Sequence, residues 1–392
     1  MSLRDRILAI LFAAFLVVLV ARAARKEGGV LVTNQGFGAR FLAGDDPYFD
    51  PALGRRIHSP YPPSLALVAA PLALLPTPAA RVAWALAQAC ALVAAFVLLR
   101  RWARRWWPDV APQAPLLFAC ALLLASRFVL RDAAGGGGNL VYMVLALAGL
   151  ELAFSGRELA AGAPLALSLV LKPNLAPLLL FFAATRRWKA IASTVACAAV
   201  LFLLPALSFG FGRYLDLAER WVGDVWSYAQ QDESTPASDT TMNQSLAAAA
   251  QRLLEPSAAR VAALALALAL VAWAAVVAAR ARPGRPAAIA ALAFLPLALL
   301  VSPITWKAHH AALLPLFFVL CAVAWAKRRW SPLATFLAVY WIACDLASEE
   351  VVGRALRDRL QALSIVTWGD VALLAVALVL VATPDVDPHA TR

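Results

Sequence analysis

The sequence predicts an all-α fold: a polytopic bundle of transmembrane helices that forms a single membrane domain over residues 1–392. Of its residues, 62% are hydrophobic and only 15% are charged, whereas soluble domains are about half apolar and about one quarter charged. The mean hydropathy is +0.74. Apolar runs of about 16–23 residues recur along the chain, close to the length with which a helix crosses about 30 Å of hydrocarbon. A helix is favoured there because it satisfies its own backbone in lipid.

Ten apolar runs are expected to be spans. They cover residues 7–23, 80–99, 112–128, 139–154, 188–206, 258–279, 286–301, 309–326, 331–347 and 367–383. Short basic loops separate several of them, at residues 100–105, 157, 186–189, 280–285 and 327–329. Basic loops stay in the cytoplasm, so the protein is expected in the plasma (cell inner) membrane with a cytoplasmic N-terminus. The same rule makes 24–62 a first external loop and 207–257 a long external loop.

Two apolar stretches do not fit as simple spans. Residues 161–184 lie between two basic loops, so they must enter and leave on one side, and Lys172-Pro173 interrupts them. Two half-helices broken at Pro173 meet that requirement. Residues 61–78 carry several prolines and are expected to form a half-helix or an interfacial helix rather than a full span. In the long loop, Trp221, Trp226 and Tyr228 suit an interfacial amphipathic helix.

The charge and the cysteines do not indicate nucleic acid, metal or cofactor binding. The net charge is +12, but the basic residues lie in the short loops that orient the chain. The five cysteines lie inside apolar runs without metal-ligand spacing, as packing residues do. Residues 1–24 resemble a signal peptide, but no small-residue cleavage site follows, so they are expected to stay as the first helix.

The first external loop holds candidate catalytic residues. Asp45, Asp46 and Asp50 could provide a general base, or they could simply form a solvated turn around Pro47. Further on, His58 and the Tyr61-Pro62-Pro63 run could contact a substrate, or they could be a proline-rich lead into a membrane helix.

Two further candidates lie next to membrane helices. The four glycines at 135–138 precede Asn139 and could bring backbone amides close to an anion; the alternative is a flexible loop. Lys172 lies in an otherwise apolar stretch, which is costly and marks a functional candidate. It could hold a lipid phosphate, or its side chain could extend so that the ammonium reaches the membrane interface.

The last candidate joins two distant segments. Asn243-Gln244-Ser245 and the run from Ser302 to His310 are both placed outside. Lys307, His309 and His310 could bind phosphate, or the histidines could pack at the interface. A zinc site would need more ligands at suitable spacing, and none is expected.

These motifs resemble, in order, those of glycosyltransferase family 87, whose GT-C-type membrane enzymes include polyprenol-phosphate-mannose-dependent mannosyltransferases. The resemblance runs from about residue 30 to 330. It is carried by residues 44–48, 61–63, 138–139, 172–173 with 186–188, 243–245 and 302–310. The family usually has an Asp just after the first helix, taken as the base; residues 30–34 occupy that region here without one. In addition, glycine replaces the Gln of the glycine element, and the His pair lies one residue further from Trp306 than expected.

The resemblance implies a hexosyltransferase. It would pass a sugar, with mannose first among candidates, from a polyprenyl phosphate to a glycan or glycolipid acceptor, inverting the anomeric carbon on the external or periplasmic face. Partners would be membrane lipids and the lipid-linked sugar, without nucleic acid. The expected donor phosphate-binding residues are Lys172, His309, His310, Lys307 and Arg40. The expected substrate-binding residues are Asn34, Tyr48, His58, Tyr61, Asn139, Asn243, Gln244, Ser245 and Trp306. A transporter or flippase of a lipid-linked sugar, or a catalytically altered family member, stays open.

Overall fold

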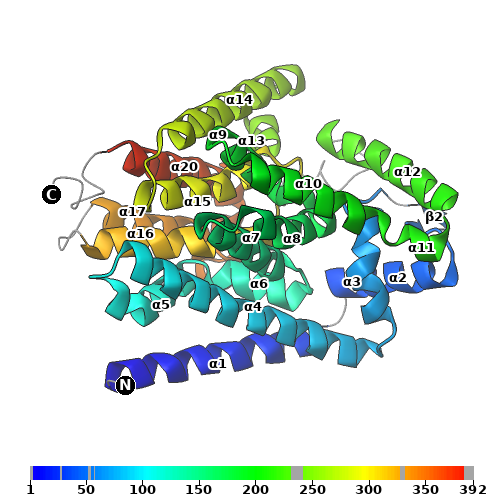
Figure 1. Ribbon diagram of the computed structural model, residues 1–392, viewed down its shortest axis with the longest axis horizontal. Helices are drawn as coiled ribbons and strands as arrows, with labels where there is room; N and C mark the ends of the chain where they lie inside the picture. The colour runs from blue at the N-terminus through cyan, green and yellow to red at the C-terminus, as the bar shows by residue number, and fades with distance from the viewer. Residues whose placement is uncertain are drawn as a thin grey trace.

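The computed structural model describes residues 3–26, 29–51, 54–56, 58–230, 242–326 and 332–383, and within them the chain is helical apart from one small ribbon (Figure 1). The first half contains α1 (Leu3–Arg25), α2 (Val30–Ala43), β1 (Phe49–Asp50), β2 (Arg55–Arg56), η1 (Pro63–Leu65), α3 (Ala66–Ala73), α4 (Thr77–Trp106), η2 (Ala111–Gln113), α5 (Ala114–Leu124), α6 (Ser126–Gly135), α7 (Asn139–Phe154), α8 (Glu158–Leu171), η3 (Pro173–Leu175), α9 (Leu178–Ala184) and α10 (Trp188–Leu203). The second half contains α11 (Ala206–Phe209), α12 (Phe211–Gln230), α13 (Leu246–Leu253), α14 (Pro256–Arg280), α15 (Arg285–Val301), η5 (Lys307–Leu313), α16 (Leu314–Ala326), α17 (Pro332–Tyr340), η6 (Trp341–Asp345), α18 (Glu349–Val352), α19 (Arg354–Ala362) and α20 (Ile365–Ala382). The all-α membrane fold expected from composition is confirmed.

Each of the ten expected spans coincides with helical structure within the described residues, but these helices differ in length. Among the described residues, six helices are long and apolar enough to cross a bilayer, and a seventh crossing is made if one bent pair counts as a span. That pair joins 111–124 to α6 through a bend of 68°. Helices α7 and α15 have only 16 and 17 residues, or about 24–26 Å at 1.5 Å per residue. They can be short because they lie inside the protein: α15 is buried from Pro286 to Leu300.

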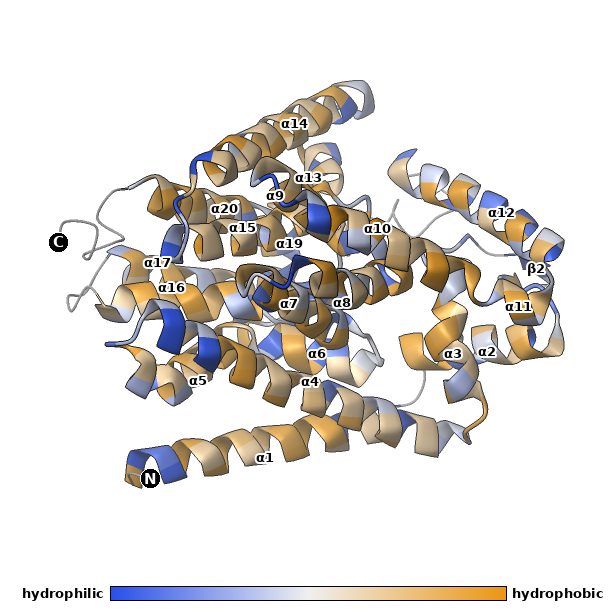
Figure 2. Ribbon diagram, in the orientation of Figure 1, coloured by the Kyte–Doolittle hydropathy of each residue, from blue (hydrophilic) through white to orange (hydrophobic). Residues whose placement is uncertain are grey.

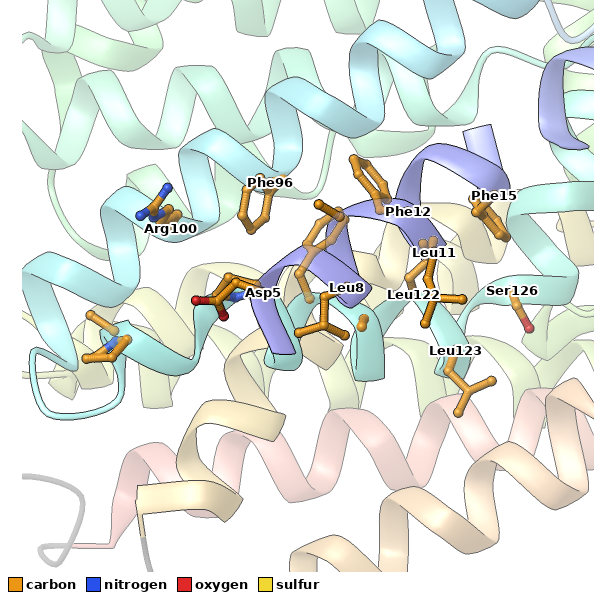
Figure 3. Close-up of a pocket in the computed structure, with 16 residues that line it drawn as sticks. Asp5, Leu8, Leu11, Phe12, Phe15, Phe96, Arg100, Leu122, Leu123 and Ser126 are labelled. Atoms are coloured by element: carbon orange, nitrogen blue, oxygen red, sulfur yellow. The ribbon is translucent and has the colours of Figure 1, made fainter. Parts of the chain in front are cut away.

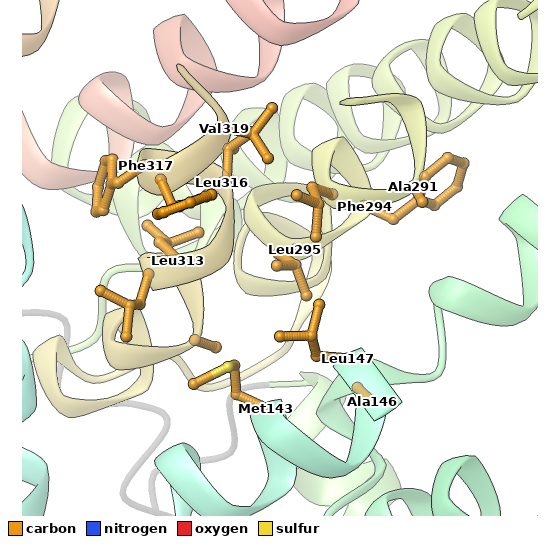
Figure 4. Packing of buried hydrophobic residues seen from close by; sticks show 14 of the residues in the cluster. Met143, Ala146, Leu147, Ala291, Phe294, Leu295, Leu313, Leu316, Phe317 and Val319 are labelled. Atoms are coloured by element: carbon orange, nitrogen blue, oxygen red, sulfur yellow. The ribbon is translucent and has the colours of Figure 1, made fainter. Parts of the chain in front are cut away.

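The hydrophobic core centres on α15 and its neighbours. Phe294 and Leu295 of α15 pack near Leu316 of α16 and Leu147 of α7 (Figure 4). The hydropathy colouring shows apolar residues around most helices of the bundle (Figure 2). This is the pattern of helices that face either lipid or other apolar helices rather than water.

Hydrogen bonds gather several of the basic loops at one end of the bundle. Arg105 donates to the Phe154 carbonyl over 2.8 Å, and Arg285 donates to the Trp106 carbonyl. Arg187 donates to the Ala153 carbonyl over 2.7 Å. The loops after α4, α7, α9 and α14 therefore lie together, as their shared assignment to one side of the membrane requires.

The broken stretch begins and ends at this same end. Arg187, just after α9, reaches Glu158 at the start of α8, with 3.1 Å between NH1 and Oε1. Between them the helix breaks at Lys172, whose backbone is extended, and resumes at Pro173. The predicted entry and exit on one side, with the break at Lys172-Pro173, is confirmed in the geometry of the chain.

The opposite end is built from helices of 4 to 20 residues. Helices α2, α3, α11 and α12 gather there, far from both chain termini (Figure 1). The expected loop at 24–62 contains the helix α2, and the stretch 61–78 contains η1 and α3 before α4 begins at Thr77, in agreement with the expected half-helix. Helices α2 and α3 touch at Gly38, where a Cβ would lie 2.1 Å from the Ala69 carbonyl oxygen. Only a glycine permits this close approach.

Helix α12 is amphipathic, as expected for the long loop. Phe211, Leu215, Val222 and Trp226 form an exposed apolar stripe at helical spacing. A second stripe, with Tyr214, Leu217, Asp224 and Tyr228, faces the protein and is buried. The bands of alternating colour on α12 show this mixture (Figure 2). Helix α12 therefore carries a buried carboxylate, Asp224, on the side that faces the protein.

An apolar groove of about 470 Å³ lies between α1, α4 and α5 (Figure 3). Phe12 and Phe15 of α1, Phe96 of α4 and Leu122 of α5 line it. Arg100 lies near one end of the groove and Ser126 near the other (Figure 3).

Candidate active site

A buried polar chain lies at the end of α7 and α8 that is remote from the basic loops. Lys172 follows the last residue of α8, and Asn139 is the first residue of α7. The Lys172 ammonium donates to Asn139 Oδ1 over 2.8 Å, and Asn139 Nδ2 donates to Asp132 Oδ1 over 2.6 Å. Asp132 is fully buried, and Lys172 and Asn139 are each 7% exposed. An amide thus links a buried cation to a buried anion, which lowers the cost of holding both away from water.

Tyr61 completes this group from the first loop. The Lys172 ammonium lies 6.0 Å from the centre of the Tyr61 ring, at the outer limit of a cation–π contact. Burial, and then the negative charge of Asp132, raise the pKa of Tyr61 to about 12. The side chain is therefore a neutral phenol at physiological pH, so it adds an aromatic face but no charge to the site.

The glycine run packs against Asp132 and the start of α7, and so it supports this site. Asp132 accepts from the Leu140 amide at the start of α7, so an internal carboxylate occupies this helix N-terminus. Gly137 must lack a side chain, because a Cβ there would lie 1.9 Å from Asp132 Oδ1. Trp84 donates to the carbonyls of Gly136 and Gly137. The loop is thus fixed by packing, and the alternative of a flexible loop is wrong.

The predicted union of the 243–245 and 302–310 segments is present. Asn243 Oδ1 accepts from the Thr305 amide over 2.9 Å, and Asn243 Nδ2 donates to the Pro303 carbonyl over 2.9 Å. The backbone N–H of Gln244 donates to the Thr305 carbonyl over 2.6 Å, and the Ser245 side chain caps α13. All three residues are buried. Their polar atoms hold the loop before η5, so they act on a substrate only through that loop.

The two histidines of η5 have different surroundings. His310 is fully buried, with Nε2 2.8 Å from Asp370 Oδ2 and its ring 4.9 Å from that of Phe128. Tyr340 donates to the other oxygen of Asp370 over 3.0 Å. His309 is only partly buried, and its Nδ1 accepts from the Trp306 amide over 3.3 Å. His309 is therefore the histidine that is open to a ligand, and His310 holds η5 in position.

Lys307 belongs to a second group of cations. Its ammonium donates to Gln361 Oε1 over 3.2 Å, and its side chain is largely buried. Arg127, Arg131, Arg252 and Arg357 all act on it electrostatically. Trp306, which precedes it, is 40% exposed and leaves its ring available at the surface.

The first loop is tied to α12 through carboxylates. Asp46 accepts from the Tyr48 amide over 2.9 Å and pairs with Arg56 and Arg220 at 3.5 and 3.8 Å. Arg56 also pairs with Asp224 at 3.3 Å. His58 Nδ1 lies 2.8 Å from Asp224 Oδ1. Two segments far apart in the sequence thus form one charged network.

Other residues of this loop have structural partners. Arg40 donates to the Pro47 carbonyl through Nε and NH2, which keeps its guanidinium within the loop instead of beside Lys172. Tyr48 is buried, packs on Phe37 at 5.3 Å and donates to the Tyr61 carbonyl over 3.0 Å. Burial raises the pKa of Tyr48 well above its usual value.

The remaining loop candidates are spread out. Asn34 is buried in α2. Asp45 is exposed beside Gly44, which ends α2 in the left-handed conformation. Asp50 lies in β1 opposite Arg55. The described structure does not gather these three with Lys172 through any of its hydrogen bonds, and their roles stay predictions.

Sequence reasoning did not single out Asp224 or Asp370 as site residues. Asp370 had a detectable signal, because a lone Asp inside an apolar run is costly and points to a partner. Asp224 had a weaker one: it lies on the buried stripe of an amphipathic helix that otherwise holds aromatic and aliphatic residues.

Comparison with known proteins gives a family match. The model of glycosyltransferase family 87 matches residues 60–303, which is more than half of the 392 residues. The crystal structure of ArnT from Cupriavidus metallidurans bound to undecaprenyl phosphate is similar to this structure with 16% sequence identity and a TM-score of 0.47, over 94% of this chain and 76% of that chain. No curated protein matches this sequence.

Proposed function

Since the chain belongs to glycosyltransferase family 87, we propose that it transfers a sugar from a polyprenyl-phosphate donor to a hydroxyl of a glycan or glycolipid acceptor. Mannose is the first sugar to test. The chain is a membrane glycosyltransferase; the donor, sugar and acceptor are the parts proposed here.

The observation that carries the proposal is the buried ammonium of Lys172. It lies at a break between two helices inside an apolar bundle, and Asn139 and Asp132 orient it. Such a cation at membrane depth is expensive to hold and serves a polar ligand. The donor of this class is amphipathic, with apolar tails and one phosphate. A phosphate at Lys172 would leave those tails in the bilayer.

The residues near Lys172 suit a departing phosphate. Lys172 supplies the positive charge, and His309, whose Nδ1 accepts from the Trp306 amide, has Nε2 left to donate a hydrogen bond to the phosphate. Both interactions strengthen as the bond between the anomeric carbon and the phosphate oxygen breaks, because negative charge then grows on that oxygen. One displacement by the acceptor oxygen inverts the anomeric configuration. Asp45, Asp46 and Asp50 are the sequence candidates for taking the acceptor proton.

Sidedness follows from the two ends of the bundle. Arg105, Arg187 and Arg285 lie at one end, and we assign that end to the cytoplasm. The site then opens on the external or periplasmic face of the plasma membrane. Helix α12 lies in the external interface, with Trp226 toward the lipid.

The test is a transfer assay on the purified protein in lipid nanodiscs. Polyprenyl-phosphate mannose, other polyprenyl-phosphate hexoses and nucleotide sugars are offered in parallel to a lipid extract that contains acceptors. We expect transfer from a polyprenyl-phosphate sugar with inversion, and none from the nucleotide sugars. Transfer from a nucleotide sugar alone would reject the donor class. Binding of polyprenyl-phosphate sugar without transfer would indicate a catalytically altered member.

A further inference from the structure

The first loop and α12 form a histidine–aspartate pair. His58 and Asp224 are 166 residues apart in the sequence, and His58 Nδ1 lies 2.8 Å from Asp224 Oδ1. The Asp224 side chain is only 3% exposed, whereas that of His58 is 39% exposed. The buried carboxylate thus fixes the Nδ1 edge of the imidazole, while part of the ring is exposed to solvent.

Two residues besides His58 hold Asp224 through three nitrogen donors. Arg56 NH1 and NH2 lie 3.3 and 3.4 Å from its two oxygens, and the Ser59 amide donates to Oδ2 over 3.3 Å. Arg56 already balances the charge of the carboxylate, so a neutral imidazole suffices as the remaining donor. An ionised carboxylate only accepts hydrogen bonds, so Nδ1 carries the proton and Nε2 has a lone pair.

The backbone around His58 is fixed as firmly as its ring. Tyr228 reaches the His58 carbonyl at 3.5 Å, Trp221 donates to the Pro60 carbonyl at 3.4 Å, and Tyr48 donates to the Tyr61 carbonyl at 3.0 Å. A general base must be held within reach of the proton that it removes. Contacts from both α12 and the first loop meet that need for His58.

The pair and the contact to Lys172 belong to one short segment of the first loop. His58 and Tyr61 are three residues apart, which is at most about 11 Å along an extended chain. The Tyr61 ring centre lies 6.0 Å from the Lys172 ammonium. The segment that holds His58 therefore also supplies an aromatic neighbour of the phosphate-binding cation.

The first-loop carboxylates are less suited to the same task. Asp46 is engaged by the Tyr48 amide, Arg56 and Arg220. Asp50 lies in the short ribbon, and Asp45 is exposed at the turn that ends α2. The Asp that the family resemblance leads one to expect after the first helix is absent from residues 30–34.

We propose that His58, oriented by Asp224, is the general base of the transfer. This inference rests on the proposed function. The acceptor hydroxyl gives its proton to His58 Nε2 while its oxygen forms a bond to the anomeric carbon. The bond from that carbon to the phosphate oxygen breaks, and its electron pair leaves with the polyprenyl phosphate. His58 then returns the proton to water. In this scheme His58 is a catalytic residue and Asp224 is a positioning residue.

The decisive variant is His58→Asn, tested against Arg55→Gln, a change at an exposed residue of the same loop. The Asn amide can still donate to Asp224 from near the Nδ1 position, but it offers no base. We expect His58→Asn to lower the kcat of transfer by about 10²-fold or more, with the KM for the donor within about threefold. Arg55→Gln is expected to transfer at the wild-type rate.

Two further variants separate chemistry from structure. Free imidazole is expected to restore part of the activity of His58→Gly. Asp224→Asn is expected to lower kcat more than it raises KM, because it disturbs the tautomer and orientation of the ring. Wild-type kcat in His58→Asn would overturn the inference and leave the proposed function standing, as would a His58→Gly variant that binds the donor but is not rescued. Absence of transfer by the wild type would instead reject the proposed function.

Discussion

The Lys172 ammonium and the Asn139 side chain, 33 residues apart in the sequence, are joined by a hydrogen bond of 2.8 Å at the break between two membrane-embedded helices. Asn139 in turn donates a hydrogen bond from Nδ2 to Asp132, which is fully buried. A cation in this position keeps a fixed direction without being neutralised by direct contact with the carboxylate. The proposed binding of the donor phosphate at Lys172 depends on this arrangement.

The glycine loop should control the position of Lys172. In Gly137→Ala the new Cβ would lie 1.9 Å from Asp132 Oδ1, so the carboxylate must move and release Asn139. Displacement of about 1 Å in a catalytic group can lower a rate about 10²-fold, and we expect a loss of that order in a sugar-transfer assay. Gly135→Ala is the control, because a Cβ there meets nothing within 4 Å. Equal losses in both variants would show that the loop itself matters rather than its contact with Asp132.

Carboxylates of the first loop should be dispensable as bases. If His58 takes the proton, Asp45→Asn and Asp50→Asn retain transfer within about threefold of wild type, since neither removes a group that exchanges a proton with the acceptor. Initial rates at saturating donor check this. A fall of about 10²-fold or more in either variant would restore that carboxylate as the base.

The buried Asp370 should matter for stability. It accepts from Tyr340 at 3.0 Å and lies 2.8 Å from His310 Nε2. Asp370→Ala removes the hydrogen-bond acceptor of both buried partners, Tyr340 and His310. We expect this loss to lower the free energy of unfolding by about 2–4 kcal/mol. The control Asp358→Ala removes an exposed carboxylate and should change it by about 0.5 kcal/mol or less. Unfolding in detergent, followed by loss of native fluorescence, measures both. An Asp370→Ala protein as stable as wild type would rule out a supporting role for this network.

Sidedness can be read from single cysteines in a background without the five native ones. Asp216→Cys lies on the exposed face of α12, and Ser155→Cys lies beside Arg105 at the basic end. A membrane-impermeant maleimide added to intact cells should label the first and reach the second only after permeabilisation. The reverse pattern would place the site in the cytoplasm.

The sequence predicts the fold well where a physical rule is strong and local. All ten apolar runs are helical, and the break at Lys172-Pro173 follows from a lysine and a proline in an apolar stretch. The short length of some crossing helices was not predicted, because apolarity alone does not distinguish a helix that faces lipid from one buried in protein. Helix α15 is of the second kind.

The site was only partly predictable, for a different reason. Lys172, Asn139 and Tyr61 were predicted separately as binding residues and lie together in the structure, but the link through Asp132 was not predicted. His310 and Arg40 were expected to bind phosphate, yet Asp370 and the Pro47 carbonyl occupy them. The His310–Asp370 pairing joins residues 60 positions apart, and such a pairing leaves no mark in a single sequence. The Arg40–Pro47 contact is local, but it depends on the conformation of the turn after α2.

The most direct measurement of the central claim is the binding of polyprenyl phosphate to the wild type, Lys172→Gln and Lys189→Gln, each in nanodiscs, followed by retention of the lipid in native mass spectrometry. Lys189 is an exposed lysine at the start of α10, at the basic end. We predict that the wild type and Lys189→Gln retain the lipid equally, and that Lys172→Gln binds it at least about tenfold more weakly, a loss of about 1.4 kcal/mol. Equal retention by all three proteins would contradict the placement of the donor phosphate at Lys172.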